Sequence, residues 1–373
     1  MAYPGNKAAL LALLGMTAAL SASTAHADAT VTFGQDQSVS FGFGLRTSYS
    51  SVEHAASDGS HSNDFTLDSA RLYFGGQLTK EIGGMFNTEW DGDKIRVLDA
   101  AGKFAIAPEL NIWAGRLLSP SDRANMAGPY YSLGGGYWAG VASRYGYNGG
   151  IFRGRDDGVT VWGDVLDGRL GYSVGAFEGH TFGIGALTQD QARTAGLRTE
   201  DKLMVAGRLQ YDFWDKEPGY YGTGNYLGTK DILAIGLAAR SQKQGVLTTT
   251  ATGDYRSWSA DFLLEKRLGG TGAAAGAVSL EAAVYDYDTG NVIRSEQGHA
   301  WLVGAGYILH RWQPFVRYQK FAADTNVDTR QADIGVNYII SGYNAQVSAL
   351  VSRTSVTALA DQSKLSVALQ LQY

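Results

Sequence analysis

The stretch KLSVALQLQY, from Lys364 to Tyr373, places a large apolar side chain at every second position. This alternation is typical of a β-strand that buries one of its two faces. Chain ends usually fray and carry polar residues, so an apolar strand face at this place needs a cover. The cover can be a protein core or a lipid bilayer. The side chains on the apolar face are Leu365, Val367, Leu369, Leu371 and Tyr373.

The same two-residue period recurs along the chain from residue 38 onward and predicts about sixteen strands. Most of them run ten residues or more, whereas strands of soluble sandwiches average about five or six. Bacterial membrane barrels have an even number of strands, which this prediction meets. The expected spans are 38–50, 65–79, 82–92, 95–106, 109–119, 157–166, 169–179, 202–214, 231–241, 255–268, 277–288, 299–309, 312–322, 331–341, 343–353 and 363–373.

The connections between these strands alternate in length. Residues 120–156 and 180–201 form long connections, and residues 107–108 and 167–168 form short ones. Outer-membrane barrels combine long extracellular loops with short periplasmic turns, and this pattern fits a chain that starts in the periplasm. One inner connection, residues 215–230, is longer than the pattern requires. We interpret its GTGNYLGTK stretch as a flexible periplasmic turn.

These observations predict an all-β fold, a transmembrane antiparallel β-barrel of about sixteen strands with a long loop folded into its lumen. A closed barrel pairs every backbone group and can therefore lie in lipid. Closure requires the last strand to pair with the first, which places Tyr373 in the aromatic girdle at the periplasmic interface. The alternative is a soluble β-sandwich. After residue 27, no apolar run approaches the 18 residues of a transmembrane helix.

The first residues resemble a secretory signal. Lys7 precedes an apolar run from Ala8 to Leu20, and an Ala-His-Ala site ends at Ala27. We expect cleavage there, which assigns residues 1–27 to a signal peptide and residues 28–373 to the barrel. The alternative is a membrane anchor, although the run is shorter than the ~20 residues of a spanning helix. The chain has no cysteine, which removes disulfides and thiolate metal sites.

Residues 67–123 resemble the front half of phosphate-selective porin O/P-type proteins. The matching positions are Arg71 with Gly75 and Gly76, Glu89 to Asp93, Val97 to Ala100, Pro108, and Gly115-Arg116 with Pro120. The resemblance implies a sixteen-stranded, usually trimeric outer-membrane porin with a loop folded into the pore. Phosphate-selective members line their constriction with many Arg and Lys, whereas this chain has 31 basic and 36 acidic residues and a net charge of -5.

The longest expected outer segment, residues 119–157, is the best candidate for a functional site. It is rich in arginine and tyrosine, and its aromatic content argues against disorder. We expect it to fold into the lumen and narrow it, so that charged side chains in the constriction set selectivity. The alternative is a loop that packs over the mouth or on a neighbouring subunit.

Strand parity predicts a lumen face that carries both signs of charge. The expected pore-lining or constriction residues are Arg71, Arg116, Arg123, Arg144, Arg153, Arg155, Arg208, Arg317, Glu89 and Asp261. Histidine spacings of zinc enzymes and the Gly-x-Ser-x-Gly motif of hydrolases do not occur in the sequence, so neither an enzyme nor a cofactor or metal is expected.

The predicted function is a water-filled porin channel of the bacterial outer membrane. It would pass small hydrophilic solutes or ions by diffusion, with anions such as phosphate among the candidates. The expected partners are outer-membrane lipid and further copies in a homotrimer, and nucleic acid is not a partner. The alternatives are a structural or ligand-binding barrel without an open channel, and a barrel enzyme.

Overall fold

The computed structural model describes residues 29–90, 92, 94–145, 154–179, 187–197, 200–269 and 276–373. The predicted signal peptide, residues 1–27, lies outside the described residues. Among the residues that are described, no helix is both long and apolar enough to cross a membrane.

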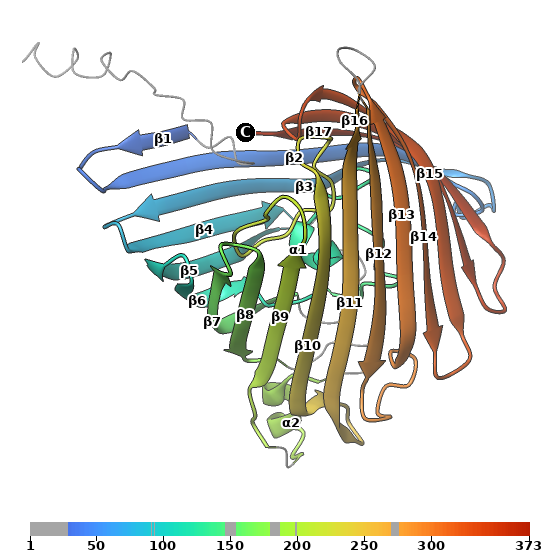
Figure 1. Ribbon diagram of the computed structural model, residues 1–373. Coiled ribbons are helices and arrows are strands. Elements are labelled where there is room, and N and C mark those ends of the chain that lie inside the picture. The colour runs from blue at the N-terminus through green and yellow to red at the C-terminus, as the bar shows by residue number, and fades with distance from the viewer. Residues whose placement is uncertain are drawn as a thin grey trace, which may run out of the picture.

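The structure is a closed antiparallel barrel of sixteen strands, β2 to β17, which confirms the predicted fold class. All sixteen expected strands are present. A further short strand, β1, was not expected, and it lengthens the sheet by one member (Figure 1). The strands are β1 (Ala29–Thr32), β2 (Ser38–Val52), β3 (Ser62–Gln77), β4 (Ile82–Trp90), β5 (Ile95–Ala107), β6 (Leu110–Leu118), β7 (Arg155–Val165), β8 (Leu170–Phe177), β9 (Met204–Asp212), β10 (Ile232–Leu247), β11 (Thr252–Leu268), β12 (Gly276–Asp288), β13 (Gly298–Leu309), β14 (Trp312–Ala323), β15 (Asp328–Ser341), β16 (Ala345–Val356) and β17 (Gln362–Gln372).

Pairing between β17 and β2 closes the barrel, with a register that runs from Lys364 opposite Val52 to Gln372 opposite Gly44. The next pair, Tyr373 and Phe43, exchanges two backbone hydrogen bonds of 2.8 Å, and the two rings stack. Beyond this point β1 continues along the same edge of β2, beginning with Ala29 opposite Phe41. The backbone groups of β2 are therefore paired along the seam, as a strand in lipid requires.

The strands bury one face and expose the other, and the exposed face is apolar. In β10, the outward side chains include Ile235 and Leu237, which are 45% and 55% exposed, whereas Arg240 on the lumen face of the same strand is 4% exposed. Outward rings occur in pairs, such as Trp312 with Tyr338. An apolar outer band with aromatic residues near its edges is the surface that lipid covers in membrane barrels.

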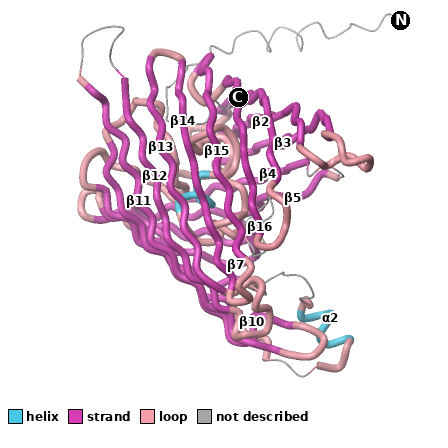
Figure 2. Tube along the Cα trace, turned by 90° about the vertical axis from the view of Figure 1, so that its right-hand side faces the viewer, coloured by secondary structure: helices cyan, strands magenta, loops and turns pink. Residues whose placement is uncertain are grey.

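One end of the barrel carries the long loops and the other carries mostly short turns. Helix α2 (Gln189–Thr194) lies at the long-loop end, on the opposite side of the molecule from Tyr373 (Figure 2). Helix α1 (Arg123–Ala127) lies inside the ring of strands, in the connection between β6 and β7. The lumen is therefore occupied by chain, and the segments that occupy it define the candidate site.

Candidate functional site

The described part of the connection between β6 and β7, residues 119–145, enters the lumen and is called the crossing loop below. It starts with α1, whose N-cap residue Asp122 accepts a hydrogen bond from the backbone N–H of Asn125 at 3.3 Å. The hydroxyl of Tyr285 on β12 donates to the same carboxylate at 2.9 Å. Burial raises the pKa of the Asp122 carboxyl, and the neighbouring carboxylate of Asp261 adds to this effect. The start of the loop is thereby fixed to the wall at β11 and β12.

The crossing loop then reaches the opposite wall of the barrel. The Tyr130 hydroxyl donates to Ser69 on β3 at 3.1 Å, and the Gln370 amide on β17 donates to the Tyr130 carbonyl at 3.2 Å. At Gly135 the backbone has φ of +55°, and a Cβ there would lie 2.2 Å from the Ser348 hydroxyl oxygen. Only glycine allows this close approach to the wall.

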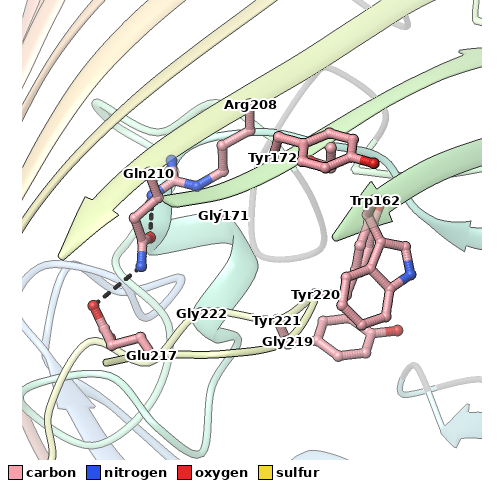
Figure 3. A pocket seen from close by; sticks show the side chains of 11 residues that line it. Trp162, Gly171, Tyr172, Arg208, Gln210, Glu217, Gly219, Tyr220, Tyr221 and Gly222 are labelled. Atoms are coloured by element: carbon pink, nitrogen blue, oxygen red, sulfur yellow. Dashed lines mark hydrogen bonds between the residues drawn. The ribbon is translucent and has the colours of Figure 1, made fainter. Parts of the chain in front are cut away.

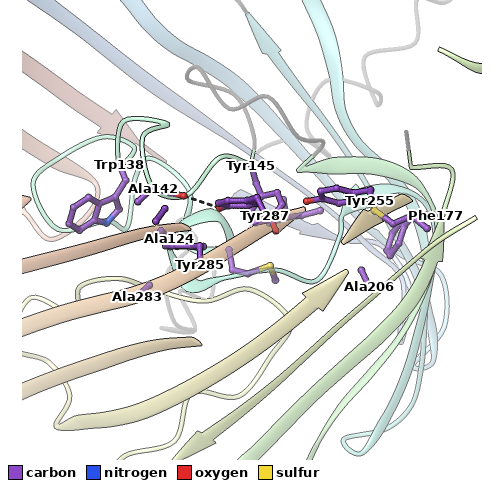
Figure 4. Close-up of a cluster of buried hydrophobic side chains, with 14 of the residues drawn as sticks. Ala124, Trp138, Ala142, Tyr145, Phe177, Ala206, Tyr255, Ala283, Tyr285 and Tyr287 are labelled. Atoms are coloured by element: carbon purple, nitrogen blue, oxygen red, sulfur yellow. Dashed lines mark hydrogen bonds between the residues drawn. The ribbon is translucent and has the colours of Figure 1, made fainter. Parts of the chain in front are cut away.

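The last described part of the loop returns to β11–β14. The indole N–H of Trp138 donates to Glu281 at 3.1 Å, and the hydroxyl of Tyr287 donates to the Ala142 carbonyl at 2.8 Å. The ring of Tyr145 packs edge-on against that of Tyr287, within a cluster of buried aromatic and small side chains (Figure 4). The loop thus spans the barrel from wall to wall and does not merely cover its mouth.

Arginines on the wall hold the crossing loop through its backbone carbonyls. Guanidinium groups are suited to this because their N–H donors have a fixed planar geometry. Each of four strand arginines donates to at least one loop carbonyl: Arg46 to Gly135 at 2.6 Å, Arg208 to Ser121 at 3.1 Å, Arg240 to Pro120 at 3.1 Å and to Ser119 at 3.2 Å, and Arg317 to Leu133 at 3.0 Å.

A second segment, residues 213–231 between β9 and β10, enters the lumen from the short-turn end and is called the turn segment below. The expectation of a flexible turn at its GTGNYLGTK stretch is therefore wrong. Glu265 accepts hydrogen bonds from the backbone N–H groups of Tyr226 and Gly228, and the amides of Asn225 and Gln313 bond to each other at 3.0 Å. These partners lie on β11 and β14, so the segment is packed against the inner wall.

The two inward segments meet at a buried ion pair. Both guanidinium NH groups of Arg123, in the crossing loop, donate to Glu217, in the turn segment, at 2.8 Å each. The two side chains are 1% and 4% exposed. Arg123 also donates to the Thr223 carbonyl at 2.7 Å, which adds a second bond between the segments. The nearby Asp261 forms a bidentate pair with Arg208 at 2.5 and 2.9 Å and takes the backbone N–H of Arg123 at 3.1 Å.

A small pocket lies between the turn segment and the inner wall of β7–β9 (Figure 3). On one side it has Trp162 and Tyr220, whose ring centroids are 5.9 Å apart. On the other side Gln210 links Arg208 to Glu217, accepting from the first at 2.8 Å and donating to the second at 3.1 Å. The polar groups in this pocket are already engaged in holding the turn segment.

A second group of charges lies on the wall formed by β3–β7. Arg71 donates to Glu89 at 2.8 Å and to the Tyr137 hydroxyl at 2.5 Å, and Arg155 donates to Asp99 at 2.8 Å. The carboxylates are covered, whereas the Arg155 side chain is 20% exposed. On this wall a cationic side chain, Arg155, therefore keeps contact with solvent.

The structure brings most of the expected lumen residues together in two groups. Arg123, Arg208 and Asp261 form the central group, and Arg71, Glu89 and Arg155 lie on the β3–β7 wall. Arg317 pairs with Asp333 at 2.8 Å, and Arg144 pairs with Glu296. Arg153 lies outside the described residues.

Arg116 does not belong to either group. The strand register aligns it with Asp157, two positions from the pair of Ala114 with the 45% exposed Val159, and residues two apart on a strand share a face. Arg116 and Asp157 form an ion pair of 3.2 Å in which the side chains are 37% and 59% exposed. The register thus places Arg116 on the outer face, and the prediction that it lines the lumen is wrong.

Several lumen residues were missed by the sequence reasoning, above all Glu217, Tyr220 and Tyr221 in the turn segment. The only signal in the sequence was the unusual length of this connection. Its acidic and aromatic residues find their partners in the crossing loop and in β6, far away along the chain.

No family model and no curated protein matches the chain. Among solved structures, the anion-selective porin from Comamonas acidovorans is 13% identical, with a TM-score of 0.57 over 91% of this chain and 100% of that one. The chain has the fold of an outer-membrane porin.

Two further porin-fold structures have similar scores. The outer membrane channel DcaP of Acinetobacter baumannii is 11% identical, with a TM-score of 0.55 over 92% of this chain and 100% of that one. OmpT of Vibrio cholerae in its trimer form is 13% identical, with a TM-score of 0.53 over 91% of this chain and 100% of that one. At these identities the likeness shows the porin fold. The resemblance to phosphate-selective porins stays a prediction.

Proposed function

We propose that this chain is a passive channel of the bacterial outer membrane that carries small hydrophilic solutes or ions, and that it catalyses no reaction. The observation that carries the proposal is a closed barrel with an apolar outer face, a charged lumen and a loop that crosses this lumen from wall to wall. An inward loop that narrows a water-filled barrel sets both the size limit and the selectivity of a channel.

The proposed path of a solute through the lumen runs along the β3–β7 wall, where charged and aromatic side chains keep some solvent exposure. Arg155 keeps 20% of its side chain exposed and its partner Asp99 keeps 2%. Tyr221 of the turn segment is 37% exposed on the same side of the lumen. Covered carboxylates beside a partly exposed guanidinium give a local potential that favours anions. We therefore propose a mild preference for anions, without selectivity for phosphate.

We also propose a homotrimer, as in the trimer form of the Vibrio cholerae protein. On the outer face of β3–β6, small residues align across four neighbouring strands in the register pairs Gly76–Gly84, Gly84–Gly102 and Gly102–Ala114. The rings of Phe74 and Phe86 lie beside this row. Small residues let backbones of neighbouring subunits approach closely in a membrane, and a flanking aromatic pair can fill the remaining space.

Reconstitution of the purified protein into planar bilayers tests the channel function. We expect stepwise potassium chloride currents and, in a salt gradient, a reversal potential whose sign indicates mild anion preference. The alternative is a barrel that the two inward segments close completely. Insertion into the bilayer without any current would support this alternative. Release of fatty acid from phospholipid vesicles would instead indicate an enzyme.

A further inference from the structure

Besides Arg71, the β3–β7 wall carries the basic side chains of Arg155 and Lys103, which lie at different depths of the lumen. Asp99, Ala101 and Lys103 point inward along β5, and Asp99 accepts a hydrogen bond from Arg155 at 2.8 Å. The Lys103 ammonium group lies 4.5 Å from the ring centroid of Trp113 on β6. Lys103 is four positions after Asp99, and a strand rises ~3.3 Å per residue, so the two basic positions are about 13 Å apart along the wall.

Tyr221 of the turn segment lies between these two positions. Its hydroxyl is 3.9 Å from the sulfur of Met85, and the register pairs Met85 with Ala101, the residue midway between Asp99 and Lys103. Its ring lies 5.9 Å from that of Trp113, which is the ring beneath Lys103. On the other side, the Tyr221 hydroxyl is within electrostatic range of Asp99 and Arg155.

The three side chains thus form a row in the order Arg155, Tyr221, Lys103, with a ring between two cations. Arg155 is held by its Nε through Asp99, and Lys103 is held over Trp113. The Tyr221 ring is backed by Tyr220 at a centroid distance of 5.4 Å. Each member is fixed from behind and Tyr221 remains 37% exposed, so the row offers a prepared surface to a solute.

We propose that this row recognises small aromatic monocarboxylates as they pass the channel, an inference that rests on the proposed channel function. A carboxylate forms charge-assisted hydrogen bonds with a guanidinium or ammonium group, and an aromatic ring packs in an offset or edge arrangement on tyrosine. A solute with both groups can engage a cation and Tyr221 together. Its carboxylate is then transferred from Arg155 to Lys103 while its ring stays near Tyr221.

Simple anions cannot make all of these contacts. Acetate can engage one cation but has no ring for Tyr221, and inorganic phosphate, with more charge, meets only two separated cations that each have their own partner. An aromatic contact of this type corresponds to about 2- to 10-fold in affinity. We therefore expect the row to bind benzoate about 2- to 10-fold more tightly than acetate.

Block of the chloride current in planar bilayers tests the inference, with benzoate, cyclohexanecarboxylate and acetate as probes at neutral pH. In the wild-type channel we expect benzoate to block at a concentration about 2- to 10-fold below that of the other two. Cyclohexanecarboxylate has the same charge and nearly the same size as benzoate, so it separates ring stacking from size.

Variants locate the site. Tyr221→Ala should raise the half-blocking concentration of benzoate to that of acetate, and Tyr221→Phe should keep the wild-type value because the ring remains. Lys103→Gln should weaken the block by all three carboxylates. The control is Tyr211→Ala, because Tyr211 is also 37% exposed but lies on the outer face beside Phe213.

The outcomes separate the two proposals. Equal block by all three probes in a wild-type channel that conducts potassium chloride refutes the aromatic site and leaves the channel function intact. This comparison decides the matter even if Tyr221→Ala does not fold. Absence of chloride current in the wild type refutes the channel function itself.

Discussion

The ion pair between Arg123 and Glu217 should decide whether the turn segment stays inside the barrel. The change with the clearest expected effect is Glu217→Gln, which keeps the size of the side chain and removes its charge. In the wild type, Glu217 takes two hydrogen bonds of 2.8 Å from Arg123 and one of 2.6 Å from the Tyr226 hydroxyl. The variant leaves a guanidinium that is 1% exposed without its bidentate partner.

The magnitude follows from the burial of this pair. Removal of one partner from a buried ion pair costs about 3–5 kcal/mol, because the remaining charge stays desolvated. The lower end applies here, since Asp261 remains 3.7 Å from the Arg123 guanidinium as a second counter-ion. A cost of about 3 kcal/mol shifts the equilibrium between the docked and the released turn segment by roughly 100-fold. The barrel itself should persist, because its strand pairing does not depend on this contact.

Limited trypsin digestion of the protein in detergent measures this shift. Lys216 and Lys230 lie within the turn segment, and cleavage after them requires the backbone to leave the lumen. When reclosing is faster than cleavage, the cleavage rate follows the population of the released state. We expect the variant to be cut at these sites roughly 100-fold faster than the wild type and to show larger and noisier single-channel currents.

The matched control is Asp167→Asn, which breaks the ion pair between Asp167 and Lys216 at the edge of the same segment. These side chains are 90% and 39% exposed, and exposed pairs contribute about 0–1 kcal/mol. This variant should digest at nearly the wild-type rate. Equal resistance of the Glu217→Gln variant and the wild type would refute the view that the Arg123 pair holds the turn segment.

Three further predictions concern the loop, the charges and the assembly. Deletion of residues 126–150 should raise single-channel conductance, because the lumen loses the part of the loop that crosses it, and an unchanged conductance would contradict this. Arg155→Gln should move the reversal potential toward cation preference. Arg317→Gln should instead change the conductance more than the reversal potential, because Arg317 donates to the Leu133 carbonyl of the crossing loop at 3.0 Å. Gly84→Leu should shift the protein from trimer to monomer in size-exclusion chromatography with light scattering, while the barrels keep their heat-sensitive migration in detergent gels.

The strands could be predicted because each of the sixteen strands of a membrane barrel must meet the same physical requirement on its two faces. Each strand has lipid on one face and a polar interior on the other, so alternation is strong wherever the inner face is polar, as in β11 with its buried Ser259, Asp261 and Glu265. Alternation is weak where the inner face is apolar as well. In β6, the inward Trp113 and Leu117 pack against lumen segments and are 8% and 0% exposed. Arg116 was therefore assigned to the wrong face, since both faces of its strand contain large apolar residues.

The crossing loop could be predicted from its length and aromatic content, but the turn segment could not. The residues that draw the turn segment inward are Glu217, Tyr220 and Asn225, and each of them also fits an exposed turn in the sequence alone. Their partners Arg123, Trp113 and Gln313 lie about 90 to 110 positions away along the chain. Turn chemistry is local, whereas this segment is positioned by contacts across the barrel.

The number of charges in the lumen is a poor guide to selectivity in this barrel. Arg46, Arg208 and Arg317 each donate to a carbonyl of the crossing loop, so they act on the shape of the lumen. Their positive charge is further offset by wall carboxylates such as Asp261 and Asp333, which pair with Arg208 and Arg317. Under the proposed function, a solute meets the smaller set of cations that keep some solvent exposure on the β3–β7 wall, where Arg155 lies. This proposal reconciles an acidic chain with a preference for anions, because the carboxylates are buried where they position arginines.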